Sequence, residues 1–135
     1  MSRASAIALF AVVIFGCRTI EREGGIALPE NAAPLSYAEL LTRARGQAGA
    51  ALDAFYLDSW IDLEQSAQRL EQTARFLPKA THVPPEFKAR VEPEANALRD
   101  DANKLIEAAK AKDSRQTNEI MQRINQRIRE MRSKE

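Results

Sequence analysis

The sulfur and imidazole side chains that bind transition metals are few: one cysteine, one histidine and three methionines. Cys17 and His82 together cannot supply the four nitrogen and sulfur ligands of a structural zinc site. His82 and Met131 form the remaining pairing, because an imidazole and a thioether can bind copper or heme iron. A histidine in a proline-rich loop is usually exposed, and a helical methionine usually fills a core. We therefore predict no metal or cofactor, with non-covalent heme or copper at His82 and Met131 as the alternative.

The patterns of familiar catalytic sites are missing from the sequence. It contains no Glu-x-x-His pattern for a di-iron centre, no glycine-rich phosphate loop, and no third residue that would complete a nucleophile–base arrangement around His82. Acidic pairs occur at Asp100-Asp101 and at Glu92 and Glu94, where we expect solvated helix surface. The sequence therefore predicts a protein without a catalytic centre.

Three aromatic residues, Phe55, Tyr56 and Trp60, lie close together in the sequence. A large aromatic residue at the end of a helical bundle usually belongs to the core. The same rings could instead form a wall that contacts a ligand or a partner protein, because aromatic side chains combine a large apolar surface with specific geometry. We therefore include them in a candidate contact surface.

Arg123 and Arg127 stand one helical turn apart in the C-terminal part of the chain. We expect them on a solvated face, with Glu119 as the i,i+4 partner of Arg123. The alternative is contact with an acidic partner or with anionic lipid headgroups. The two arginines complete the candidate contact surface.

The N-terminal segment differs from the rest of the chain. Arg3 precedes ten consecutive apolar residues, Ala6–Phe15, which are followed by Gly16 and Cys17. As a helix this run would span about 15 Å, half of the roughly 30 Å hydrocarbon core of a bilayer. The run is too short for an ordinary transmembrane helix and has the proportions of a secretory signal peptide, which we assign to residues 1–16.

Ile14-Phe15-Gly16-Cys17 resembles a bacterial lipobox, in which an aliphatic residue stands three positions before the cysteine and a small residue directly before it. The resemblance implies that Cys17 carries lipid on its thiol, becomes the new N-terminus and binds the protein to a membrane. A diacyl anchor would hold the protein stably, since one acyl chain binds a bilayer only marginally. The implied location is the bacterial cell envelope, with the protein facing the periplasm or the exterior.

Composition and charge narrow the function classes further. The 135 residues fit one domain, and the net charge of +1 lacks the basic excess typical of nucleic-acid-binding proteins. Gly24-Gly25, Pro29 and Pro34 interrupt any helical period after the cysteine. We therefore predict a lipidated Cys17 with a flexible tether over residues 17–35, followed by a bundle over residues 36–135.

From Ser36 onward the apolar residues recur with a helical period. Ser36 and Glu39 have the spacing of a capping box, which marks the start of a helix. The apolar stripe changes its step shortly before Trp60. We predict two helices, about 36–56 and 58–78, joined by a tight corner, with one continuous helix as the alternative.

Prolines separate this first half of the bundle from the second. Pro78 and Pro84-Pro85 end the second helix, and the third carries apolar residues from Phe87 to Ala109, with Pro93 expected to kink or restart it. The apolar face of the last helix consists of Ile120, Ile124, Ile128 and Met131. Four such segments with short loops predict an all-α, antiparallel up-down-up-down four-helix bundle. A three-helix bundle with one long first helix is the alternative.

Residues 36–135 also resemble the cytochrome c-prime and b-type bundles in helix order and length, and in the Ala-Lys-Ala-Lys-Asp turn before an arginine-rich last helix. That resemblance implies heme bound through a Cys-x-x-Cys-His motif, or through a methionine in the first helix and a histidine in the last. This chain has no cysteine after Cys17, and its first and last predicted helices lack these ligands. Neither set of heme ligands carries over.

The sequence thus predicts a non-enzymatic, lipid-anchored bundle of the cell envelope that has a structural role or binds another envelope protein. The alternative is a periplasmic heme- or metal-binding bundle, or an electron-transfer bundle, that uses His82 and Met131.

Overall fold

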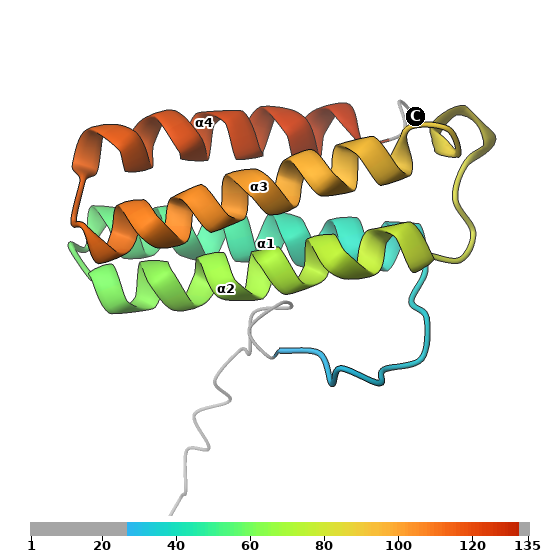
Figure 1. Ribbon diagram of the computed structural model, residues 1–135, viewed down its shortest axis with the longest axis horizontal. Coiled ribbons are helices and arrows are strands. Elements are labelled where there is room, and N and C mark those ends of the chain that lie inside the picture. Colours follow the sequence, from blue (N-terminus) through green and yellow to red (C-terminus); the bar gives the residue numbers. More distant parts are fainter. Residues whose placement is uncertain (1–26, 133–135) are drawn as a thin grey trace, which may run out of the picture.

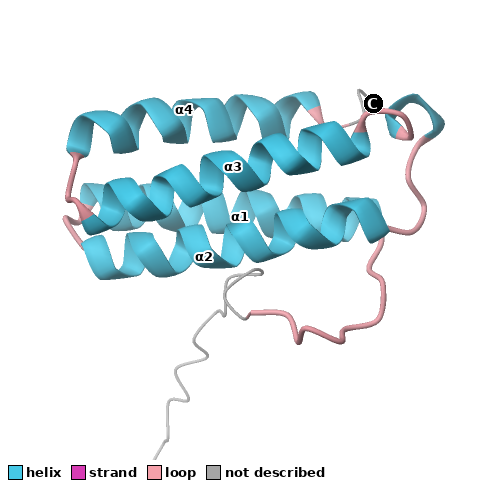
Figure 2. Cartoon of the chain, in the orientation of Figure 1, coloured by secondary structure: helices cyan, strands magenta, loops and turns pink. Residues whose placement is uncertain are grey.

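The computed structural model describes residues 27–132, and this range contains four α-helices, two short 3-10 helices and no strand. The elements are α1 (Tyr37–Tyr56), α2 (Trp60–Phe76), η1 (Leu77–Lys79), η2 (Pro85–Phe87), α3 (Val91–Lys110) and α4 (Ser114–Glu130). The helices lie side by side and alternate in direction (Figures 1 and 2). The predicted all-α four-helix bundle is confirmed, and the alternative with one long first helix is wrong because α1 and α2 are separate.

The core is built from the apolar stripes of all four helices. Its largest side chains with under 2% exposure are mainly leucines, and alanines fill many of the positions between them. The small alanine side chains allow neighbouring helices to approach closely. The fully buried large residues are Leu40, Leu63, Leu70, Leu77, Leu98, Leu105, Ile124, Met131, Thr73 and Thr117.

Helix α1 begins with the predicted capping box. The Glu39 N–H donates to Ser36 Oγ at 3.2 Å, and the Ser36 N–H donates to Glu39 Oε2 at 2.9 Å. These two contacts satisfy backbone donors that have no partner inside the helix. Helix α4 begins in a related way, since the Gln116 N–H donates to Asp113 Oδ1 at 2.9 Å.

The α1–α2 and α3–α4 corners have the same backbone geometry. Asp58 and Lys112 occupy the left-handed region, with φ of 54° and 51°. The N–H groups of the following residues, Ser59 and Asp113, donate to carbonyls five residues earlier at 2.9 and 3.0 Å. This is a helix-ending motif that satisfies free carbonyl groups without glycine. Each corner turns the chain back within three residues.

The similarity extends over the whole of each helical hairpin. Every bound of α3 and α4 lies 54 residues after the matching bound of α1 and α2, so hairpin 1 (residues 37–76) and hairpin 2 (residues 91–130) have equal helices and equal corners. Identical residues recur at this spacing in α2 and α4: Gln68 and Gln122, Arg69 and Arg123, Gln72 and Gln126, Arg75 and Arg129. The chain is therefore built from two matching hairpins.

Buried positions follow the same 54-residue spacing. In α1 they include Leu41, Ala44, Gln47, Ala48, Ala51 and Ala54, which match Ala95, Leu98, Asp101, Ala102, Leu105 and Ala108 in α3. In α2 they include Leu63, Ser66, Ala67, Leu70 and Ala74, which match Thr117, Ile120, Met121, Ile124 and Ile128 in α4. Each hairpin thus presents one equivalent face to the other.

The connection between the hairpins corrects two predictions. Phe87 belongs to η2, so α3 starts later than its apolar pattern indicated. Pro93 neither kinks nor restarts α3, because it is the third residue of that helix. An N–H in the first turn has no intrahelical acceptor, so a proline is tolerated there.

Residues 28–35 lie against the bundle, and we call this segment the strap (Figure 1). Leu28, Ala32 and Leu35 are partly buried and pack against the core. Within the predicted tether of residues 17–35, residues 28–35 therefore pack on the bundle. Residues 17–26 lie outside the described residues.

Candidate functional site

The predicted lipidation site, Cys17, lies outside the described residues. Among residues 27–132, no helix is long and apolar enough to span a membrane.

His82 and Met131 lie in different environments. Met131 is 1% exposed and belongs to the core, whereas His82 is exposed in the connection between the hairpins. His82 adopts φ of 53°, and its Nδ1 lies 3.1 Å from Thr81 Oγ1. A site that used both side chains would require the Met131 thioether to leave the core. Within the described range no group of three or more histidine, cysteine or acidic residues could hold a metal ion.

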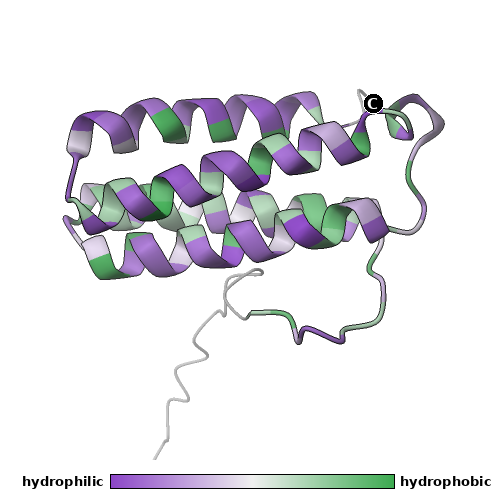
Figure 3. Ribbon diagram, viewed as in Figure 1, coloured by the Kyte–Doolittle hydropathy of each residue, from purple (hydrophilic) through white to green (hydrophobic). Residues whose placement is uncertain are grey.

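The predicted aromatic residues do come together at the α1–α2 corner. The Phe55 ring contacts Tyr56 and Trp60, with centroids 6.0 Å apart in both pairs. Tyr56 is 77% exposed, and sequence reasoning missed its neighbours Leu57 and Ile61, which are 79% and 72% exposed. We call these five residues the apolar corner. In Figure 3 the ribbon is green, the colour of hydrophobic residues, near the start of α2.

The turn itself does not require this apolar corner. The matching α3–α4 corner has the same backbone geometry and places Ala109, Lys110, Ala111, Ser114 and Arg115 at the five equivalent positions. Since a polar sequence forms the same turn, the exposed apolar side chains at the α1–α2 corner have no role in turn formation.

Arg123 is exposed, as predicted for a solvated face, and Arg127 is partly exposed, but both arginines pair with carboxylates on α3. Arg123 Nε lies 3.2 Å from Asp101 Oδ1, and Arg127 Nη2 lies 3.4 Å from Asp101 Oδ2. Arg127 also pairs with Glu94 at 3.0 Å. The Asp101 side chain is 6% exposed, so the expectation of a solvated acidic pair at Asp100-Asp101 is wrong for Asp101. Glu119 pairs instead with Arg115 at 3.2 Å.

This ion-pair cluster has a neutral counterpart in hairpin 1. Thr73 Oγ1 donates to Gln47 Oε1 at 2.8 Å in the core between α1 and α2. Gln47 and Thr73 are the 54-residue equivalents of Asp101 and Arg127. Each hairpin therefore contains one polar link between its two helices at the same height. Arg127 links α3 and α4 through Glu94 and Asp101.

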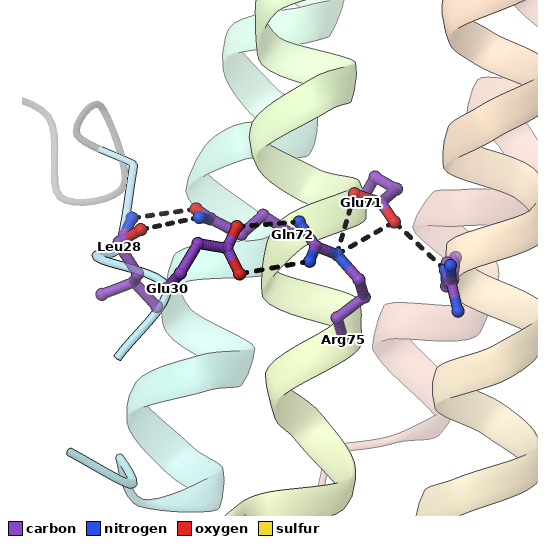
Figure 4. Close-up of polar contacts among 6 residues, drawn as sticks. Leu28, Glu30, Glu71, Gln72 and Arg75 are labelled. Carbon is purple, nitrogen blue, oxygen red and sulfur yellow. Dashed lines mark hydrogen bonds and ion pairs between the residues drawn. The ribbon is translucent and has the colours of Figure 1, made fainter. Parts of the chain in front are cut away.

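The strap is held by a small network of polar side chains on α2 (Figure 4). The Leu28 N–H donates to Gln72 Oε1 at 2.9 Å, and Gln72 Nε2 donates to the Leu28 carbonyl at 2.6 Å. Arg75 Nη2 pairs with Glu30 Oε1 at 3.3 Å. The Gln72 amide thus binds the strap backbone as a neighbouring strand would, and Arg75 binds its carboxylate.

Glu71 completes this network, which we call the strap site. Its Oε1 lies 3.1 Å from Nε of Arg75 and 3.1 Å from Nε of Arg99 on α3. Burial by itself would lower the pKa of the Arg75 guanidinium. The hydrogen bonds and charges of Glu30 and Glu71 outweigh this effect and raise the pKa above its usual value. Two arginines are therefore balanced by two carboxylates.

An open groove between α1 and α4 was missed by the sequence analysis. One hollow of about 390 Å³ is lined by Arg45, Asn125, Ile128, Arg129 and Arg132. An adjoining hollow of about 420 Å³ shares Arg45 and Arg132 and is also lined by Tyr37, Ala38, Leu41, Thr42, His82 and Pro84. Among residues 27–132, no carboxylate lines either hollow. The recurrence of Gln-Arg-x-x-Gln-x-x-Arg in α2 and α4 is the sequence signal that could have pointed to it.

The three groove arginines also lack ion-pair partners within residues 27–132. Arg75, Arg90, Arg99, Arg115, Arg123 and Arg127 all pair with carboxylates in the structure, but Arg45, Arg129 and Arg132 form no such pair there. All three are exposed. Guanidinium groups bind carboxylates and phosphates in bidentate geometry, so the groove is suited to an anion.

The chain matches no protein-family model, no curated protein and no solved structure.

Proposed function

We propose that this protein is a non-enzymatic, lipid-anchored component of the bacterial cell envelope that binds another envelope protein. The observation that carries the proposal is the run of ten apolar residues followed by Gly16-Cys17, with the lipobox-like order of Ile14-Phe15-Gly16-Cys17. Cleavage before Cys17 would remove Arg3 as the only charged residue and leave equal numbers of basic and acidic residues.

The apolar corner supports the binding role. It exposes Tyr56, Leu57 and Ile61 beyond 70%, and the equivalent corner of hairpin 2 shows that these side chains are unnecessary for the turn. Exposed apolar and aromatic clusters are typical of contact surfaces between proteins. We infer that the corner packs against an apolar surface of the partner.

The strap supports an arrangement in which the anchor holds the bundle near the membrane. With residues 28–35 held on the bundle, only the segment from Cys17 to Ala27 separates the proposed lipid from the first contact with α2. Fully extended, a segment of that length spans about 35 Å. The bundle would then stay within that distance of the bilayer.

Metabolic labelling with a palmitate analogue tests the anchor. The full chain is expressed in bacteria beside a Cys17→Ser variant, and membranes are separated from soluble material. We expect label and membrane association in the wild type and loss of both in the variant. Equal labelling of the two proteins, or no label in the wild type, would overturn the proposal.

A further inference from the structure

The strap site shows how hairpin 1 binds a short acidic segment that turns at Glu30 and Asn31, where the Ala32 N–H donates to the Pro29 carbonyl at 2.9 Å. Gln72 binds the backbone of Leu28, and Arg75 binds the carboxylate of Glu30. Glu71 lies between Arg75 and Arg99 and contacts both guanidinium groups. Every charged group of this site has an opposite charge within hydrogen-bonding distance.

The 54-residue spacing places an equivalent set of residues on hairpin 2, which we call the α4 site. Gln126 and Arg129 are identical to their counterparts Gln72 and Arg75, and Arg45 is identical to Arg99. Asn125 stands where hairpin 1 has Glu71. The α4 site therefore keeps the amide and both arginines but lacks the two carboxylates of the strap site.

The α4 site is also open and positively charged. Arg45, Asn125 and Arg129 line the hollow of about 390 Å³, together with Arg132. Three guanidinium groups around one hollow repel one another unless an anion lies between them. Ile128 and the adjoining Leu41 supply an apolar floor.

We propose that the α4 site binds a short peptide segment of a partner protein that carries two carboxylates. One carboxylate would take the position that Glu30 occupies at the strap site, and the other would take the position of Glu71. The Gln126 amide would bind the peptide backbone, as Gln72 binds Leu28. This inference rests on the partner-binding part of the proposed function and is independent of the lipid anchor.

The shape of the groove favours a peptide over a small anion. Small-molecule sites usually enclose most of their ligand, whereas this groove is open along two helices and continues into the hollow of about 420 Å³. The strap demonstrates in the same protein that a short segment with a turn fits a helix face of this composition. The peptide must displace one exposed contact, from Gln126 Nε2 to Glu130 Oε1 at 2.9 Å, and such i,i+4 contacts on a helix surface are weak.

The strap provides the probe. Three capped peptides would be made from residues 27–34: the native sequence with Glu30 as its one carboxylate, an Asn31→Asp form with two, and a Glu30→Gln form with none. They are titrated at low salt into the isotopically labelled full chain carrying Cys17→Ser, so that lipidation does not affect the result. Amide chemical shifts locate the binding site and fluorescence anisotropy gives the affinity.

We expect shifts centred on residues 125–132 and an affinity that rises about three- to tenfold with each carboxylate, as for exposed charge-assisted contacts. The triple variant Arg45→Gln/Arg129→Gln/Arg132→Gln should weaken binding of the doubly acidic peptide at least about tenfold. A matched control, Lys104→Gln/Lys112→Gln/Arg115→Gln, removes the same charge at exposed positions elsewhere and should change the affinity less than about twofold.

Several results would overturn the inference. Equal affinity for the three peptides, or equal weakening by the two triple variants, would mean that the α4 site does not recognise carboxylates. Shifts confined to Gln72 and Arg75 would mean that the peptide only replaces the strap. Shifts at residues 125–132 with phosphatidylglycerol vesicles but with none of the peptides would assign the groove to a lipid surface. Concentration-dependent self-association without peptide that is lost in the groove variant would assign it to a second copy of the chain.

Discussion

The Tyr37 hydroxyl donates a hydrogen bond of 2.6 Å to the backbone carbonyl of Met131, which joins the first residue of α1 to the C-terminal end of α4. The Tyr37 ring also stacks on Phe87 with centroids 5.7 Å apart, and the Tyr37 backbone N–H donates to the Thr81 carbonyl at 2.9 Å. One residue therefore holds together α1, α4 and the connection between the hairpins.

A Tyr37→Phe variant should unfold at lower urea concentration than the wild type. The ring keeps its contact with Phe87, but the buried Met131 carbonyl loses its donor, which should lower the free energy of unfolding by about 1–2 kcal/mol. Tyr56→Phe is the control, because the Tyr56 side chain is 77% exposed and the change should cost less than about 0.5 kcal/mol. Equal effects of the two substitutions would contradict a special role for the Tyr37 hydroxyl.

The same tyrosine should make stability depend on pH in alkaline solution. Desolvation by burial raises the pKa of Tyr37 to about 12, from a usual value near 10. The folded state therefore retains the phenol proton after the unfolded chain has lost it. The stabilising contribution is complete below about pH 10 and is lost as the pH rises through about 12. Urea unfolding across this range should show a steeper loss of stability for the wild type than for Tyr37→Phe, and parallel curves would refute the assignment.

An Asp101→Asn variant should weaken the link between α3 and α4. The substitution removes the charge that faces both Arg123 and Arg127, while Glu94 remains as a partner of Arg127. Because both arginines can still reach water, we expect a loss of about 1–2 kcal/mol in thermal or urea unfolding rather than the larger loss typical of a fully buried pair. Asp100→Asn, one residue earlier and exposed, should change stability by less than about 0.5 kcal/mol.

Two buried threonines should respond in opposite ways to replacement by valine. Thr73→Val removes the donor to Gln47 at 2.8 Å and should cost about 1–2 kcal/mol. The Thr117 hydroxyl is equally buried but has no hydrogen-bond partner in the described part of the chain. Thr117→Val replaces an unsatisfied polar group with an apolar one of similar shape, so stability should be unchanged or rise by up to about 1 kcal/mol. Equal destabilisation by both valines would show that Thr117 has a partner.

A Gln72→Ala variant should release the strap without unfolding the bundle. Both hydrogen bonds to Leu28 are lost, so amide exchange at Leu28 and proteolysis within residues 28–35 should become faster. Gln126→Ala is the matched control, since Gln126 is the equivalent residue of hairpin 2 and its side-chain amide donates to Glu130 at 2.9 Å. Unchanged protection of the strap in Gln72→Ala would contradict its assigned role.

Features specified by neighbouring residues could be predicted from the sequence. The capping box at Ser36 and Glu39 and the corner before Trp60 both depend on contacts within one or two turns of helix, and both are confirmed. Pro93 was misjudged because its effect depends on where α3 begins, and a difference of a few residues moves it into the tolerated first turn.

Features that depend on packing between helices could not be predicted. Arg123 was assigned to Glu119 by helical spacing, but Asp101 on α3 supplies a buried carboxylate across the interface. The packing of the strap could not be predicted from local sequence, because Leu28 binds Gln72, which lies 44 residues away in the chain. The matching hairpins were also missed, since equivalent core residues such as Leu63 and Thr117 differ in chemistry while sharing the same burial.

The equal hairpins give the bundle the architecture of a dimer whose two subunits are joined end to end. A helical hairpin of this length has one apolar face and needs a second such face to cover it. When the two hairpins belong to one chain, each is held at a high effective concentration near the other. Their outer surfaces can also differ, because the two hairpins have separate sequences. Hairpin 1 then carries the strap on its flank while the matching flank of hairpin 2 stays open, so two hairpins of equal length give a molecule with two different sides.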